Sequence, residues 1–87
     1  MKNSNINDEE YFRNWAESYY ESAHNLTEKI KKKKEEVKNC KDKDKIPILN
    51  NDINILQESY YDCMETARIL SAKANREKYK ILQNKNR

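Results

Sequence analysis

Apolar residues recur along this chain in steps that alternate between four and three residues, in two separate runs. This spacing is the heptad repeat, which places an apolar stripe along one side of an α-helix. The pattern predicts one helix over about residues 8–40 and a second over about residues 47–84. The two stripes, each with one charged interruption, are Phe12, Ala16, Tyr19, Ala23, Leu26, Ile30, Lys33, Val37, Cys40 and Leu49, Ile53, Leu56, Tyr60, Cys63, Ala67, Leu70, Ala74, Glu77, Ile81.

The segment 41–46 separates the two runs, and its first five residues, Lys-Asp-Lys-Asp-Lys, contain no apolar side chain. Pro47 suits the first turn of a new helix, where a missing N–H costs nothing. Because so short a connection makes consecutive helices antiparallel neighbours, we predict an all-α fold. Residues 1–87 form a single domain, an antiparallel two-helix hairpin of coiled-coil type. Residues 1–6 are expected to be a loose tail, with Asn7 as the N-cap, and residues 84–87 to fray.

Counting outward from this connection predicts which residues lie level with each other. Cys40 is expected beside Leu49, and further along Ala23 is expected beside Ala67 and Leu26 beside Cys63. Cys40 and Cys63 would then lie roughly 20 Å apart along the helix. Since a disulfide needs Cα atoms within about 7 Å, none is expected within the chain.

Charged residues are distributed in blocks that favour the same antiparallel arrangement. Residues 1–28 hold two bases and six acids, and residues 29–45 hold nine bases and four acids. Residues 46–65 hold four acids and no base, and residues 66–87 hold seven bases and one acid. Folding back at the connection sets each block beside one of opposite sign. Many weak pairs of consistent sign can select an orientation, although each exposed pair contributes only ~0.2–1 kcal/mol.

The composition argues against catalysis and against bound cofactors. Glycine is absent, so a phosphate-binding loop cannot form, and no cysteine–histidine pair has the spacing of a metal site. His24 falls on an outer heptad position, and Cys40 and Cys63 fall on the stripes as small core residues. We predict no catalytic residue, no metal and no cofactor. The chain has no apolar stretch for a membrane span and no signal peptide, which predicts a cytoplasmic protein with reduced thiols.

Several large apolar residues lie off the two stripes. Surplus apolar surface of this kind usually marks an interface, although such residues can also merely flank a small core. The predicted contact residues are Trp15, Tyr20, Ile48, Ile55, Tyr61, Ile69, Tyr79 and Leu82. They indicate a non-enzymatic protein–protein interaction module, such as an adaptor, an assembly factor or a small chaperone. The partner is either a different protein or a second copy, which would complete a four-helix bundle.

A dimeric helical regulator that binds RNA or DNA is the alternative function. Lysine occupies positions 29 and 31–34, and further bases gather near the C-terminus. Such clusters can contact phosphates. However, the run Lys29–Lys34 turns around the helix and faces the acidic half of the second helix. Aromatic residues are not interleaved with these bases, as base stacking would require.

One short segment, Ile55-Leu56-Gln57-Glu58-Ser59, resembles the start of the second helix in tubulin-binding cofactor A. That resemblance implies a small helical protein that binds β-tubulin during tubulin folding. It covers about 20 residues. The following residues, Tyr60-Tyr61-Asp62-Cys63, lack the proline of the family's Met-Ile-Pro-Asp-Cys-like stretch, and the chain ends before the family's third helix. No functional residue is carried over from the family.

Overall fold

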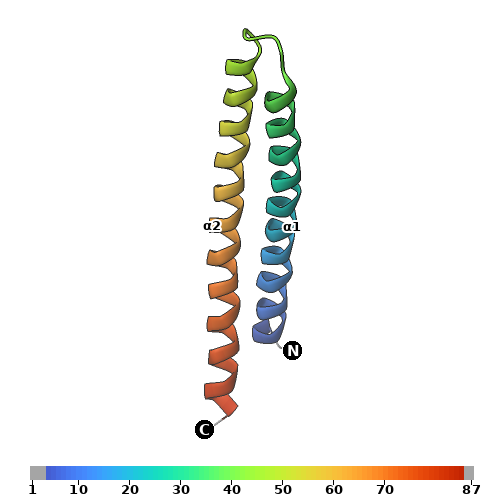
Figure 1. Ribbon diagram of the computed structural model, residues 1–87. Coiled ribbons are helices and arrows are strands. Elements are labelled where there is room, and N and C mark those ends of the chain that lie inside the picture. The colour runs from blue at the N-terminus through green and yellow to red at the C-terminus, as the bar shows by residue number, and fades with distance from the viewer. Residues whose placement is uncertain (1–3, 86–87) are drawn as a thin grey trace.

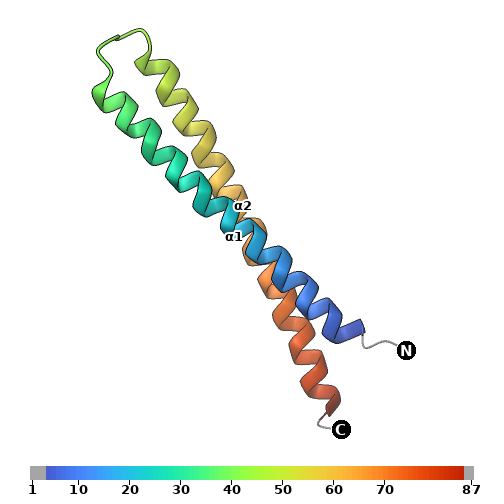
Figure 2. The ribbon, with the colours of Figure 1, turned by 90° about the vertical axis from the view of Figure 1, so that its right-hand side faces the viewer.

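The computed structural model describes residues 4–85 and consists of two long α-helices joined by a short loop (Figure 1). Helix α1 spans Ser4–Asn39 and helix α2 spans Ile46–Lys85. The helices run side by side in opposite directions, and the C-terminal end of α2 extends past the start of α1 (Figure 1). A view turned by 90° shows that their axes cross (Figure 2). The predicted all-α antiparallel hairpin is therefore confirmed.

The core follows the two heptad stripes. Among residues 8–40, all nine members of the first stripe are buried or half-buried, and Glu9 is the only other residue in that range that is not exposed. The fully buried residues of the described chain are Ala16, Ala23, Ile53, Ala67, Leu70 and Ala74, all on the predicted stripes. The side chain of Ile81, the last member of the second stripe, lies outside the described residues. One seam between two helices therefore makes up the whole core.

The helix ends differ from the prediction at the N-terminus. Helix α1 begins at Ser4 instead of about residue 8, so Asn7 lies inside the helix and is not its N-cap. Residues 4–6 belong to the helix and not to a loose tail, because nothing between Ser4 and Asn7 stops helix propagation: neither proline nor glycine occurs there. The other ends differ by one residue, and residues 84 and 85, which were expected to fray, belong to helix α2. Residues 1–3 and 86–87 of the predicted loose ends lie outside the described residues.

Asp42 organises the loop without any glycine. Its side-chain Oδ1 accepts a hydrogen bond from the N–H of Asp44 at 3.0 Å, and its carbonyl oxygen accepts one from the N–H of Lys45, also at 3.0 Å. An aspartate that bonds its own backbone two residues on is a common way to start a turn. The N–H of Leu49 then donates to the carbonyl of Lys45 at 2.9 Å, and α2 begins. None of the described residues needs a positive φ angle for this turn.

Two side-chain contacts between the helices report their register. The Nζ atom of Lys33 lies 3.7 Å from Oδ2 of Asp52, and the Nζ atom of Lys73 lies 5.4 Å from the centre of the Phe12 ring. In each contact the two residue numbers add to 85. The contacts are three heptads apart on both helices, so the same register holds along most of the hairpin.

This register differs by about one helical turn from the predicted one, in which level pairs such as Ala23 and Ala67 have numbers that add to 89 or 90. In a helix the Cα–Cβ bond points toward the N-terminus of that helix. In the predicted register Lys33 and Lys73 would each have to extend toward the C-terminus of its own helix to make its contact. We therefore infer that level residues have numbers adding to about 85, and the stripe residues that come nearest to this sum pair at 86.

The inferred register sets three of the four core alanines against a large side chain. The level pairs become Phe12 with Ala74, Ala16 with Leu70, Tyr19 with Ala67 and Ala23 with Cys63. Each of these alanines is at most 2% exposed. Pairing alanine with alanine would alternate narrow and wide layers. Setting small against large keeps the separation of the helices more even, as close packing requires.

A disulfide test separates the two registers. In a Cys40→Ser background, Ala23→Cys is expected to form an intrachain disulfide with Cys63 under mild oxidation, because the two Cα atoms are level across the seam. Leu26→Cys, which would face Cys63 in the other register, should react more slowly. Intact mass after blocking the remaining thiols measures both rates. Faster bridging by Leu26→Cys would contradict the inferred register.

Candidate interaction surface

All eight predicted contact residues are exposed, from 39% for Tyr20 to 68% for Tyr79. They are therefore not part of the core. Tyr11 is also exposed, at 58%, and was missing from the predicted contact set. The signal that could have identified it is its spacing of four residues from Trp15, which places the two rings on one side of the helix.

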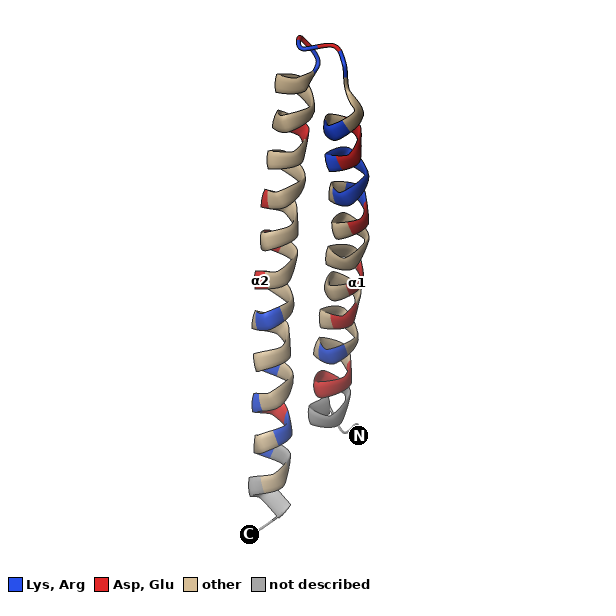
Figure 3. Ribbon diagram, in the orientation of Figure 1, with Lys and Arg blue, Asp and Glu red and all other residues tan. Residues whose placement is uncertain are grey.

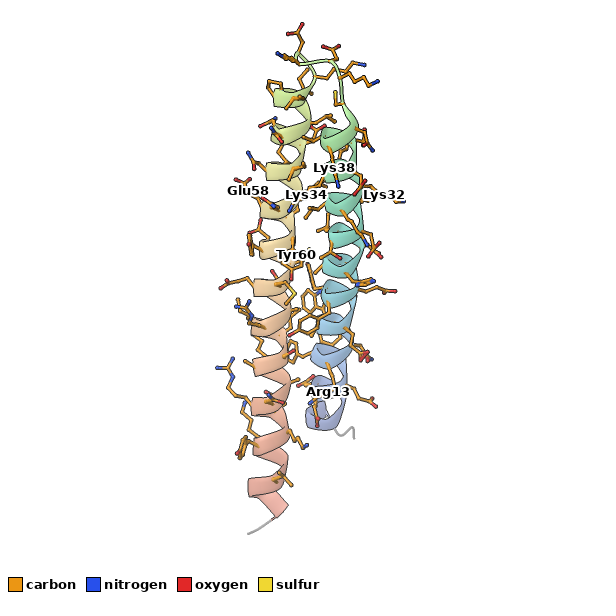
Figure 4. The ribbon with its side chains drawn as sticks, in the orientation of Figure 1. Arg13, Lys32, Lys34, Lys38, Glu58 and Tyr60 are labelled. Carbon is orange, nitrogen blue, oxygen red and sulfur yellow. The ribbon has the colours of Figure 1, made fainter. Side chains whose placement is uncertain are left out.

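These residues do not form one surface, because the seam divides Trp15 from Tyr20. Five residues turn a helix by about 140° beyond a full turn, which puts these two side chains on opposite flanks of α1. Tyr20 shares its heptad position with Arg13 and Lys34, which lie on the side of α1 that is turned toward the viewer in Figure 4. The exposed residues therefore divide between two faces.

The first of these, the isoleucine face, consists of Tyr11 and Trp15 on α1 and Ile48, Ile55 and Ile69 on α2. The three isoleucines are separated by seven and fourteen residues and therefore form a line along α2. They lie on the same flank of the seam as Trp15. Like heptad positions of the two helices meet across an antiparallel pair, and the isoleucines occupy the position of α2 next to the one that meets Trp15's position. Their exposed fractions are 63%, 53% and 50%.

An aromatic cluster forms the α1 part of the isoleucine face. The ring of Tyr11 lies 5.4 Å from the ring of Trp15 and 5.4 Å from that of Phe12, centre to centre. Lys73 of α2 covers the Phe12 ring from the other helix. Rings at these distances and tilts attract each other edge to face. The cluster therefore holds Trp15 in one orientation on the open end of the hairpin.

The second face, the tyrosine face, consists of Tyr20 on α1 and Tyr61 and Leu82 on α2. Tyr61 stacks edge to face on Tyr60 at 5.5 Å, and Tyr60 itself lies between the helices (Figure 4). Further along α2, a shallow hollow is lined by Asn75, Lys78, Tyr79 and Leu82. Tyr79 lies on the outer side of α2, between the two faces. This hollow contains no group of side chains arranged for catalysis.

The charges of the hairpin are segregated as the sequence predicts. Acidic residues on the loop half of α2 lie beside the lysine-rich half of α1, and basic residues on the other half of α2 lie beside acidic residues of α1 (Figure 3). Yet among the side chains that the structure describes (residues 8–80 and 82), Lys33 and Asp52 form the one ion pair between the helices; the other three pairs are within a helix. The charge blocks therefore act through their summed field and less through individual contacts.

The lysine run does not form one basic stripe. Lys34 lies on the α2 side of α1, whereas Lys32 points away from α2 (Figure 4). Lys33 is half-buried in the seam and lies 3.7 Å from both Asp52 and Glu36. A nucleic-acid backbone could meet only part of this run at once.

The two cysteines are both free thiols. The Sγ atom of Cys40 donates to the carbonyl oxygen of Asp42 at 3.3 Å, and Cys63 is half-buried in the seam. No three potential metal ligands of the described residues come together. Neither α1 nor α2 has a stretch both long and apolar enough to cross a bilayer.

Comparison with known proteins gives no relative: no family model, no curated protein and no solved structure matches the chain. The local resemblance to tubulin-binding cofactor A stays a prediction.

Proposed function

We propose that this hairpin is a non-enzymatic protein–protein interaction module that binds its partner through the isoleucine face. The observation that carries the proposal is the exposure of Trp15, Ile48, Ile55 and Ile69 on one flank of a rigid seam. Burying apolar surface contributes roughly 25 cal/mol per Å². Four large side chains on one face therefore offer a substantial part of the free energy of a stable complex.

The helices hold these side chains at fixed spacing, which favours recognition of another folded helix. A line of residues seven apart matches the surface of a partner helix, whose own side chains repeat at the same interval. An adaptor, an assembly factor or a small cytoplasmic chaperone would each use such a surface. Nucleic-acid binding remains the alternative, supported by the lysine run alone.

The double variant Ile55→Lys/Ile69→Lys tests the proposal. Tagged full-length protein, recovered from its native cell extract, is expected to bring down a protein partner that the variant loses, because two desolvated charges would oppose the contact. A matched control, Asn51→Lys/Ala72→Lys, adds the same charge at exposed positions outside the isoleucine face and should retain the partner. Circular dichroism should show equal helicity in all three proteins.

The same preparation separates the alternative function. Binding to phosphates weakens steeply with salt because counterions are released. A complex that disappears with nuclease or moderate salt, and that carries a high 260/280 absorbance ratio, would contradict the protein-binding proposal. Loss of helicity in Ile55→Lys/Ile69→Lys would contradict it as well, since the isoleucines would then be core residues.

A further inference from the structure

The isoleucine face of α2 is nearly complementary to itself when reversed. Every seventh residue along it gives the series Ile48, Ile55, Asp62, Ile69 and Arg76. When a second copy runs antiparallel with its Asp62 level with Asp62 of the first, Ile55 of each copy lies opposite Ile69 of the other. Asp52, one position nearer the seam, meets Lys73 of the other copy. Apolar residues thus meet apolar ones at Ile55 and Ile69 and opposite charges meet at Asp52 and Lys73, whereas Ile48 lies opposite Arg76 as a mixed pair.

The α1 side of the same face shows an independent match. Tyr11 and Trp15 lie at its open end, and Lys29 and Lys32 lie near the loop, with small polar residues between them. When a second copy runs antiparallel and the midpoint of residues 23 and 24 is level in both copies, Trp15 of one copy lies opposite Lys32 of the other. A lysine over an indole ring is attracted by the charge distribution of the ring.

The two matches share one level of the hairpin. The α2 series reverses about residue 62, and the α1 series about the midpoint of 23 and 24. These numbers add to 85.5, close to the sum of 85 given by each of the two contacts between the helices. A single two-fold axis, perpendicular to the helices, therefore satisfies both helices at once.

From this agreement we infer that the partner of the isoleucine face is a second copy of the chain. The two copies pack antiparallel, face to face, about a two-fold axis level with Asp62. This inference rests on the proposed function and names its partner. The acidic loop half of each α2 then lies against the basic half of the other α2 (Figure 3).

The tyrosine face does not support the same pairing. About the same axis, Arg13 of one copy would lie opposite Lys34 of the other, and both are exposed on that face (Figure 4). Like charges placed opposite each other disfavour a contact.

Asp62 is the one like-charged pair on the isoleucine face, at the axis itself. Asp62→Ile would complete the isoleucine line, and it is expected to tighten the dimer at least about tenfold.

Sedimentation equilibrium of the reduced full-length chain, from about 1 μM to about 1 mM, tests the pairing. The wild type is expected to approach twice its mass of 10.5 kDa. Ile55→Glu and Ile69→Lys should each weaken association at least about tenfold. An equimolar mixture of the two variants should associate again. The mixed dimer has one unaltered isoleucine pair and one acid–base pair, whereas each variant alone sets two charges against isoleucine.

Asn54→Glu and Asn75→Lys, which alter charge on the other side of α2, provide the control and should associate as the wild type does. A wild type that stays monomeric throughout overturns the inference, as does a mixture that fails to restore association. If the wild type is monomeric but Ile55→Lys/Ile69→Lys still loses a partner from the extract, the protein-binding function stands and only the partner is wrong.

Discussion

Replacing Leu70 by alanine is expected to lower the free energy of unfolding by about 2–5 kcal/mol, the range for truncating a well-packed aliphatic side chain. Leu70 is only 6% exposed and fills the seam near its crossing with α1. The remaining core consists of four alanines, Ile53 and half-buried residues. So thin a core cannot redistribute the loss, and small domains have little stability to spare.

Urea unfolding followed by circular dichroism measures this effect, at a concentration low enough that each chain is alone. Ile48→Ala is the matched control, because it also truncates an aliphatic side chain of α2 but at a position that is 63% exposed. It should change the free energy of unfolding by less than about 0.5 kcal/mol. Equal effects of the two substitutions would mean that the seam is not the core.

Enlarging Ala67 to leucine is expected to cost about 1–3 kcal/mol, even though leucine adds apolar surface. Ala67 is 0% exposed, and in the inferred register it lies opposite Tyr19. Three extra carbon atoms cannot fit between the backbone of α2 and that ring unless the helices move apart. Moving them apart would also expose the neighbouring layers, so the whole hairpin would lose packing.

The matched control is Ala72→Leu, five residues further along α2 at an exposed position. Alanine and leucine have similar helix propensities, so this change should be close to neutral. Thermal unfolding of both variants beside the wild type gives the comparison. A Tm for Ala67→Leu at or above that of the wild type would show that the helices do not approach closely at Ala67.

Sequence patterns predicted the parts of this protein that depend on local periodicity. The 3.6-residue repeat of the helix determines which residues share a side, so the stripes from Phe12 and Leu49 could be identified without coordinates. The exposure of Ile55 and Ile69 followed for the same reason. The loop could be located but not explained, because the bonds of Asp42 depend on the path that the backbone takes between two packed helices.

The division of the contact residues required the hairpin itself. Trp15 and Tyr20 are both off the seam and close in sequence, and periodicity alone ranks them alike. Only the position of α2 beside α1 decides that one belongs to the isoleucine face and the other to the tyrosine face. Each residue of α1 can be assigned to one of the two faces only when the second helix covers the seam.

By itself, then, the sequence determined that two helices form, where they turn, which stripe each buries and that they run antiparallel. The tertiary structure decided the register, because a heptad stripe slid by one turn still presents apolar residues to its partner. The two registers differ in the side chains that Ala67 and the other core alanines face, and in the positions of Lys33 and Lys73. Periodicity can be recognised along one helix alone, whereas close packing between helices depends on the side chains of both helices together.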